Sequence, residues 1–174
     1  MTNRRRFLQA ASMLMGHAAF PQVLAAFLEG TSDAPTWLDP REIRLLEQLV
    51  DLILPATDSP AASAARTHVF IDLALAACGS DEQQRAFRAG LRDLIEQGFA
   101  TADSERQVEL LAQRAAADMP LPYDRSFFRI LKDYTLTGYF HSEIGATQAL
   151  AWERVPGGYE ADVELEPGQK AWAL

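Results

Sequence analysis

The sequence contains one cysteine, Cys78, among its 174 residues. A single cysteine cannot form an internal disulfide, and it excludes a cysteine-ligated cluster and a CxxCH haem site. Because Cys78 lies in an apolar run, a small buried side chain is favoured over a reactive thiol. The GxGxxG and P-loop motifs are also missing, and Pro156-Gly157-Gly158 is more typical of a turn. The sequence therefore predicts that no cofactor is bound by this chain itself.

Positive charge is scarce as well. The chain has 24 acidic and 16 basic residues, and its formal net charge is −8. This value becomes −11 if residues 1–28 are removed, because they contain three arginines and no acidic residue. Proteins that bind nucleic acids need a basic surface, and so do proteins that dock electrostatically on anionic lipid. The charge therefore excludes nucleic acid as a partner and argues against a lipid surface.

Residue patterns typical of catalysis are missing too. There is no GxSxG motif, and Asp51, Asp58 and Asp72 have no spaced partner for paired acid and base chemistry. His68 and His141 lie far apart, without the spacing of a metal site, so solvated or locally hydrogen-bonded rings are the simplest interpretation. A metal site formed from them by folding is the alternative. Nothing in these residues by itself makes an enzyme.

The N-terminus, in contrast, contains a specific pattern. The stretch Asn3-Arg4-Arg5-Arg6-Phe7-Leu8-Gln9 matches a twin-arginine export signal, which directs folded proteins across the bacterial membrane. Residues 10–28 are apolar but interrupted, so they do not predict a transmembrane span. We therefore expect a signal segment over residues 1–28 and a periplasmic protein. A basic cap on an ordinary amphipathic helix is the alternative. The signal positions are Arg4, Arg5, Phe7 and Leu8.

The rest of the chain predicts an all-α fold, a compact bundle of about five to six helices. Residues 29–38 are expected to form a linker, 39–151 the helical domain, and 152–174 an extended C-terminal arm. Asp39-Pro40-Arg41-Glu42 combines a capping Asp, a Pro at the first helical position and a Glu three residues after the cap. Apolar residues then recur at intervals of three and four. Expected helix starts are Asp39, Ala62 or Thr67, Ser80, Ser104, Asp124 and Ser142.

Two sets of side chains on these helices carry further expectations. Ala77 and Val108 are expected to face inward on the second and fourth helices. The arginines of the third helix are expected to form a solvated face or to pair with nearby acids. These arginines are Arg85, Arg88 and Arg92.

Four segments taken together resemble the gluconate 2-dehydrogenase subunit 3 family, the small subunits of membrane-associated sugar dehydrogenases. The combination of the proline-bracketed loop with the two later elements is more specific than any one segment alone. Phe140 departs from the tyrosine usual at this position in the family. The segments are LILPATDSP (52–60), FRAGL (87–91), FFRILKDYTLTGYFHSEIG (127–145) and WERVPGGY (152–159).

The resemblance implies a non-catalytic accessory subunit of a periplasmic FAD-dependent sugar or sugar-acid dehydrogenase, of the gluconate 2-dehydrogenase or glucoside 3-dehydrogenase type. The partner it implies is a large flavoprotein of the glucose-methanol-choline type, which binds FAD. A multihaem cytochrome c subunit is a further expected partner, and membrane association would come through the complex. The small subunit would support folding, export and assembly of the large one.

Aromatic side chains in an irregular arm are typical interface anchors. They make Trp152 and Tyr159 the expected anchors. With the resemblance, the partner interface is expected in the proline-bracketed loop and the arm that starts at residue 139, at Pro55, Pro60, Tyr139, Phe140, Trp152, Pro156 and Tyr159. Two alternatives stay open from the sequence. One is a small exported metal-binding protein or enzyme that uses His68 and His141, and the other is an export chaperone that stays in the cytoplasm.

Overall fold

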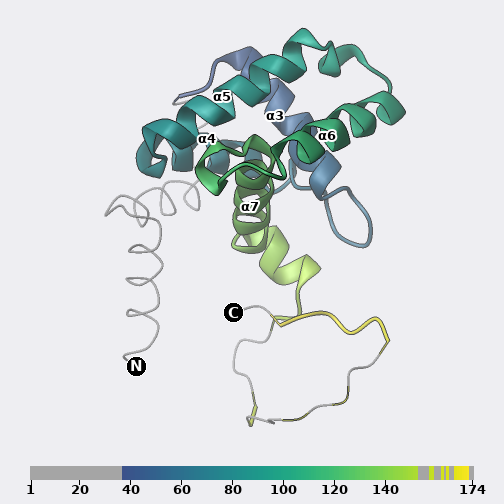
Figure 1. Cartoon of the computed structure of the whole chain (residues 1–174). Helices are drawn as coiled ribbons and strands as arrows, with labels where there is room; N and C mark the ends of the chain where they lie inside the picture. Colours follow the sequence, from purple (N-terminus) through teal and green to yellow (C-terminus); the bar gives the residue numbers. More distant parts are fainter. Residues whose placement is uncertain (1–36, 153–156, 159–161, 163, 165–166, 173–174) are drawn as a thin grey trace.

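The structure is a computed structural model that describes residues 37–152, 157–158, 162, 164 and 167–172. Over these residues the fold is all-α, as predicted, and contains no β-strand (Figure 1). The short elements are 3-10 helices at Phe99–Thr101 and Tyr123–Arg125 and a π-helix, η3, at Gly145–Ala149. The long helices are α3 (Pro40–Ile53), α4 (Thr67–Cys78), α5 (Asp81–Glu96), α6 (Ser104–Asp118) and α7 (Phe127–Phe140).

The two predicted capping boxes are present. The Asp39 carboxylate accepts hydrogen bonds from the backbone N–H groups of Arg41 (2.7 Å) and Glu42 (2.8 Å), and the Glu42 side chain accepts the Asp39 N–H. The bond from the Glu42 N–H is the main reason that the pKa of Asp39 is lowered. Ser80 and Gln83 form the same reciprocal pair at the start of α5. Each box satisfies N–H groups that a helix start leaves without an internal partner.

Two helix caps differ from the prediction. Helix α6 begins at Ser104, as predicted, but its cap is Asp103, which accepts the Arg106 N–H. Ser126, not Asp124, caps α7, because Asp124 lies within the preceding 3-10 turn. The short sixth helix begins after Ser142, as predicted: Glu143 and Ile144 are helical, Oγ of Ser142 accepts the Gly145 N–H, and the segment continues as the π-helix η3.

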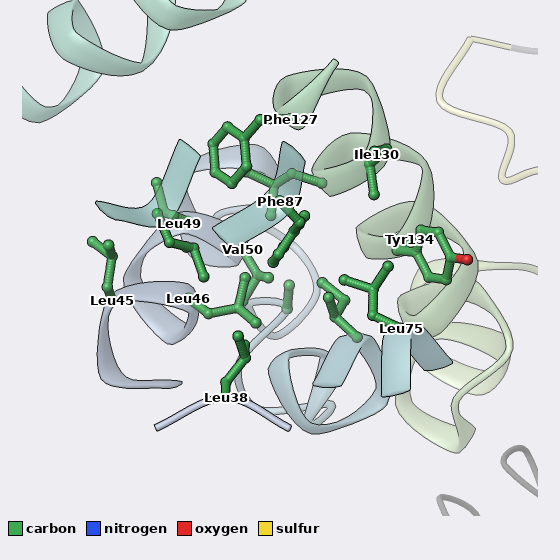
Figure 2. Close-up of a cluster of buried hydrophobic side chains, with 14 of the residues drawn as sticks. Leu38, Leu45, Leu46, Leu49, Val50, Leu75, Phe87, Phe127, Ile130 and Tyr134 are labelled. Atoms are coloured by element: carbon green, nitrogen blue, oxygen red, sulfur yellow. The ribbon is translucent and has the colours of Figure 1, made fainter. Parts of the chain in front are cut away.

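Helix α7 occupies the centre of the bundle and contacts α3, α4, α5 and α6. Phe127 at its start packs against Phe87 of α5 with ring centroids 5.1 Å apart, and both lie within the cluster in Figure 2. Gly90 makes this approach possible, since a Cβ there would lie 2.2 Å from Cγ of Phe127. Gly138 does the same for α4, where a Cβ would lie 2.6 Å from the ring of Phe70. Two glycines therefore set how closely α7 packs against two neighbours.

Two predicted inward positions are wrong. Ala77 is exposed on α4, and Val108 of α6 is 55% exposed. Helix α4 lies against both α3 and α7, and the face that it buries includes Ile71, Leu75 and Cys78 but not Ala77. Helix α6 buries only Leu110, Leu111 and Asp118, so Val108 lies outside its buried face. Burial raises the pKa of the Cys78 thiol, which supports its predicted role as a small apolar side chain.

The export signal lies outside the described residues, so Arg4, Arg5, Phe7 and Leu8 stay predictions. Within the described part of the chain, no helix is both long and apolar enough to cross a lipid bilayer.

Candidate partner-binding surface

Trp37 and Leu38, the first residues that the structure describes, are bound to two helices of the bundle. The buried carboxylate of Asp72 on α4 accepts hydrogen bonds from the N–H groups of Trp37 (3.1 Å) and Leu38 (2.7 Å). The guanidinium of Arg88 on α5 lies 4.4 Å from the centre of the Trp37 ring and donates a hydrogen bond to the Trp37 carbonyl. We call Trp37, Leu38, Asp72 and Arg88 the N-terminal clamp. It fixes residues 37–38, which were expected in the linker, to two helices.

The clamp also corrects the expectation for the arginines of α5. Arg88 is not part of a solvated face, because its guanidinium stacks on Trp37 and bonds to the backbone. Arg85 and Arg92 are exposed, as expected. With Trp37, Asp81 and Gln84, the side chains of Arg85 and Arg88 line a surface hollow of about 180 Å³.

Two other carboxylates also hold the fold together. Asp51 accepts hydrogen bonds at 2.7 Å from both the N–H and the hydroxyl of Ser63. Asp118 is buried, forms an ion pair with Arg114 (2.9 Å) and accepts the N–H of Phe128 (2.8 Å). Asp58, in contrast, is exposed in the loop after α3. Asp51 and Asp118 therefore fix loops and helix ends to the bundle.

His68 and His141 do not come together with acids into a metal-binding cluster. No group of three or more His, Cys, Asp or Glu residues in the described part of the chain could hold a metal ion. Burial lowers the pKa of His68, and the ring of exposed His141 lies 2.8 Å from the carbonyl of Thr137. A second hollow, between α5 and α6, measures about 140 Å³. Both hollows are smaller than the roughly 300–1,000 Å³ typical of a cofactor pocket.

The loop between Pro55 and Pro60 is bound on its inner side by the hydroxyl of Tyr139. The hydroxyl of Tyr139 donates a hydrogen bond to the Pro60 carbonyl (2.7 Å) and lies 3.1 Å from Oγ of Ser59. Its side chain is only 2% exposed, so it does not face a partner, which corrects the role expected for it. Pro55 and Asp58 are exposed, and Pro60 is half-buried. Tyr139 thus supports an exposed loop that lies 79 residues away in sequence.

The chain turns sharply after α7. Oγ of Ser142 donates to the Tyr139 carbonyl (2.6 Å) and accepts the N–H of Gly145 (3.0 Å). A Cβ on Gly145 would lie 1.9 Å from the Tyr139 carbonyl oxygen, so only glycine fits here. Phe140, half-buried, packs edge-on against Tyr139 with centroids 5.3 Å apart. The turn fixes where η3 begins and where the chain leaves the bundle (Figure 1).

After η3, residues near both ends of the C-terminal arm pair with each other. The Ala151 N–H donates to the Ala171 carbonyl (2.7 Å), and Ala151 and Trp172 form a parallel bridge. Nζ of Lys170 donates to the Gln148 carbonyl at 2.5 Å. Trp152 and Trp172 are each 58% exposed, whereas Pro156 and Tyr159 lie outside the described residues. We call residues 150–152 and 170–172 the C-terminal ribbon.

The family model described as gluconate 2-dehydrogenase subunit 3 matches residues 40–157, more than half of the sequence. The chain belongs to this family. The match includes the proline-bracketed loop, α7, η3 and Trp152, and it ends before the second half of the ribbon. Neither a curated protein nor a solved structure matches the sequence.

One sign of the clamp is visible in the sequence itself, at Asp72. Asp72 stands between apolar residues, in the segment Val69-Phe70-Ile71-Asp72-Leu73. A carboxylate within an apolar helix is costly to bury unless it accepts hydrogen bonds, so such a position indicates a buried partner. The identity of that partner, the backbone of residues 37–38, depends on the packing of the helices.

Proposed function

We propose that this chain is the non-catalytic accessory subunit of a periplasmic FAD-dependent dehydrogenase acting on a sugar or sugar acid. The observation that carries the proposal is the family match over residues 40–157, since the family is named for a subunit of gluconate 2-dehydrogenase. The large catalytic subunit would bind FAD, and a cytochrome c subunit would take up the electrons. This chain would support folding, twin-arginine export and assembly of the catalytic subunit.

The described residues give several carboxylates a structural role. Asp72, Asp51 and Asp118 hold backbone groups and helix ends. The exposed features of the chain include the loop at 55–60 and the ribbon beyond η3, both of which lie in or next to the family motifs. We place the partner surface on this side of the bundle, with Pro55, Pro60, Phe140 and Trp152 as members.

The export role is tested by replacing the arginine pair. The chain is expressed with the proposed catalytic flavoprotein, and dye-linked dehydrogenase activity is measured in the periplasmic and cytoplasmic fractions. In the variant carrying Arg4→Lys and Arg5→Lys, we expect periplasmic activity to fall by at least tenfold, because the signal requires the pair. Arg6→Lys is the matched control, since Arg6 occupies the free position of the motif.

The outcomes separate the parts of the proposal. Unchanged periplasmic activity in the double variant would contradict the export role. A flavoprotein that folds, reaches the periplasm and stays active without this chain would contradict the accessory role altogether. Recovery of the chain in the cytoplasm alone, after delivery of its partner, would instead support a cytoplasmic chaperone.

A further inference from the structure

The hollow beside the N-terminal clamp lies on one face of α5. Its volume is about 180 Å³, which accommodates a chemical group of a few atoms. The lining residues from α5 follow the first of them by three, four and seven positions, so their side chains share one face of the helix. They are Asp81, Gln84, Arg85 and Arg88, and Trp37 completes the lining.

Two arginines give this hollow positive charge that no ion pair neutralises. Among the residues that the structure describes, no carboxylate lies within ion-pair distance of Arg85 or Arg88. The nearby Asp72 carboxylate accepts the N–H groups of residues 37 and 38 instead. Like charges three positions apart on a helix repel each other. A bound anion would remove this repulsion.

The two guanidinium groups differ in how firmly they are held. Arg88 lies 4.4 Å from the centre of the Trp37 ring and donates through Nη2 to the Trp37 carbonyl. Its Nε is buried and has no acceptor in the described part of the chain. The guanidinium of Arg85 is exposed and forms no hydrogen bond with the described residues. The hollow thus combines a fixed cation with a second one whose N–H groups can all bind a ligand.

The charge and the donor geometry of the lining favour a carboxylate. A guanidinium binds a carboxylate through two parallel N–H···O bonds, which a spherical anion such as chloride cannot form. The two arginines and Asp81 have a formal sum of +1, so a singly charged anion neutralises the hollow. A doubly charged phosphate would add an excess negative charge to a chain whose net charge is already −8.

We propose that this hollow is a carboxylate-binding site, in which Arg85 is the main donor and Arg88 the fixed second charge. The site goes beyond the proposed function and does not depend on it. Its carboxylate comes from one of two sources, a small free acid or an acidic side chain of another protein. A titration with a small acid tests the site, and a binding measurement with the flavoprotein separates the sources.

The titration adds sodium acetate to the full-length chain, with sodium chloride at equal ionic strength as the reference. Trp152→Phe and Trp172→Phe make Trp37 the only tryptophan, so that indole fluorescence reports on the hollow. We expect a saturable change with a dissociation constant of about 1–10 mM, since a ligand of four heavy atoms binds weakly. Arg85→Ala should weaken binding about tenfold, as for a charge-assisted hydrogen bond. Arg92→Ala is the matched control, because Arg92 is exposed on α5 outside the hollow.

Two further variants test how the carboxylate is recognised. Arg85→Lys keeps the positive charge but loses the planar fork, so the affinity for acetate should fall about threefold, less than in Arg85→Ala. Asp81→Asn removes the negative charge at the hollow and should tighten acetate binding. Asp81 and Arg85 are both exposed, and urea denaturation checks that each variant is folded.

The same variants separate the two sources of the carboxylate. For an acidic side chain of the catalytic subunit, Arg85→Ala, but not Arg92→Ala, should raise the dissociation constant for the purified flavoprotein about fivefold, the upper range for an exposed ion pair. For a small free acid, Arg85→Ala should lose acetate binding and still bind the flavoprotein as the wild type does.

Two results of the titration would overturn the proposal. One is a fluorescence response to acetate that is absent in the wild type or unchanged in Arg85→Ala. The other is tighter binding of inorganic phosphate than of acetate with the same dependence on Arg85, which would exclude carboxylates as the preferred class. A wild-type chain that binds acetate but not the flavoprotein would contradict the proposed function and support the site with a small free acid.

Discussion

Trp37, near the first described residues, and the two tryptophans near the C-terminus differ in burial and in contacts. At the start, Trp37 is half-buried, stacks under Arg88, and has its N–H and carbonyl bound by side chains of two helices. At the end, Trp152 and Trp172 lie on a ribbon with more than half of each side chain exposed. The first arrangement fixes the tryptophan to two helices, and the second leaves apolar surface exposed. Contacts of the ring and of its own backbone with the helices of the bundle distinguish Trp37 from the two exposed tryptophans.

The largest expected effect comes from removing the acceptor at the centre of the clamp. Asp72→Ala leaves the buried N–H of Leu38 and the N–H of Trp37 without their acceptor. We expect a loss of about 3 kcal/mol in the free energy of unfolding, since hydrogen bonds to charged groups each contribute about 1.5–3 kcal/mol. Urea denaturation of the full-length chain measures it. Asp58→Ala, in the exposed loop, is the control and should cost less than about 0.5 kcal/mol.

A smaller loss is expected from Trp37→Ala. The variant removes the ring that contacts Arg88 and the ring of Phe87, at 6.4 Å between centroids, but keeps the backbone bonds to Asp72. We expect about 2 kcal/mol of destabilisation, below the 3–5 kcal/mol of a fully buried aromatic residue. A double-mutant cycle with Arg88→Ala should give a coupling of about 1 kcal/mol. A coupling free energy of zero in this cycle would show that the cation–π contact does not stabilise the clamp.

For Tyr139→Phe we expect a smaller loss in the free energy of unfolding than for Trp37→Ala. The change removes the hydroxyl that donates to Pro60 while the ring stays in the core. We expect a loss of about 1 kcal/mol, the typical net contribution of one hydrogen bond. Limited proteolysis should also cut the 55–60 loop faster. Ser59→Ala, which removes only the second contact, is the matched control. Equal losses in both variants would mean that the Pro60 bond does not hold the loop.

Local sequence predicts the contacts between neighbouring residues better than the contacts between distant ones. Helix starts such as Asp39 and Ser80 were predictable, because a capping box involves residues only three apart. The clamp joins residues 35 and 51 positions apart, and the support of the loop joins residues 79 apart. Such pairs depend on how α4, α5 and α7 pack. Tyr139 was expected at the interface because it lies in a segment that resembles the family, although the packing of the helices buries it.

The smallest change in the free energy of unfolding is expected for the two exposed tryptophans, and it tests their difference from Trp37 most directly. In the free chain, Trp152→Ala and Trp172→Ala should each change the free energy of unfolding by less than about 0.5 kcal/mol, as is usual for exposed positions. Trp37→Ala, measured under the same conditions, is the comparison. A loss above about 1 kcal/mol for Trp172→Ala would mean that the ribbon already packs against the domain in the free chain. Its rings would then contribute to stability, as Trp37 does, and could not serve mainly as anchors for a partner.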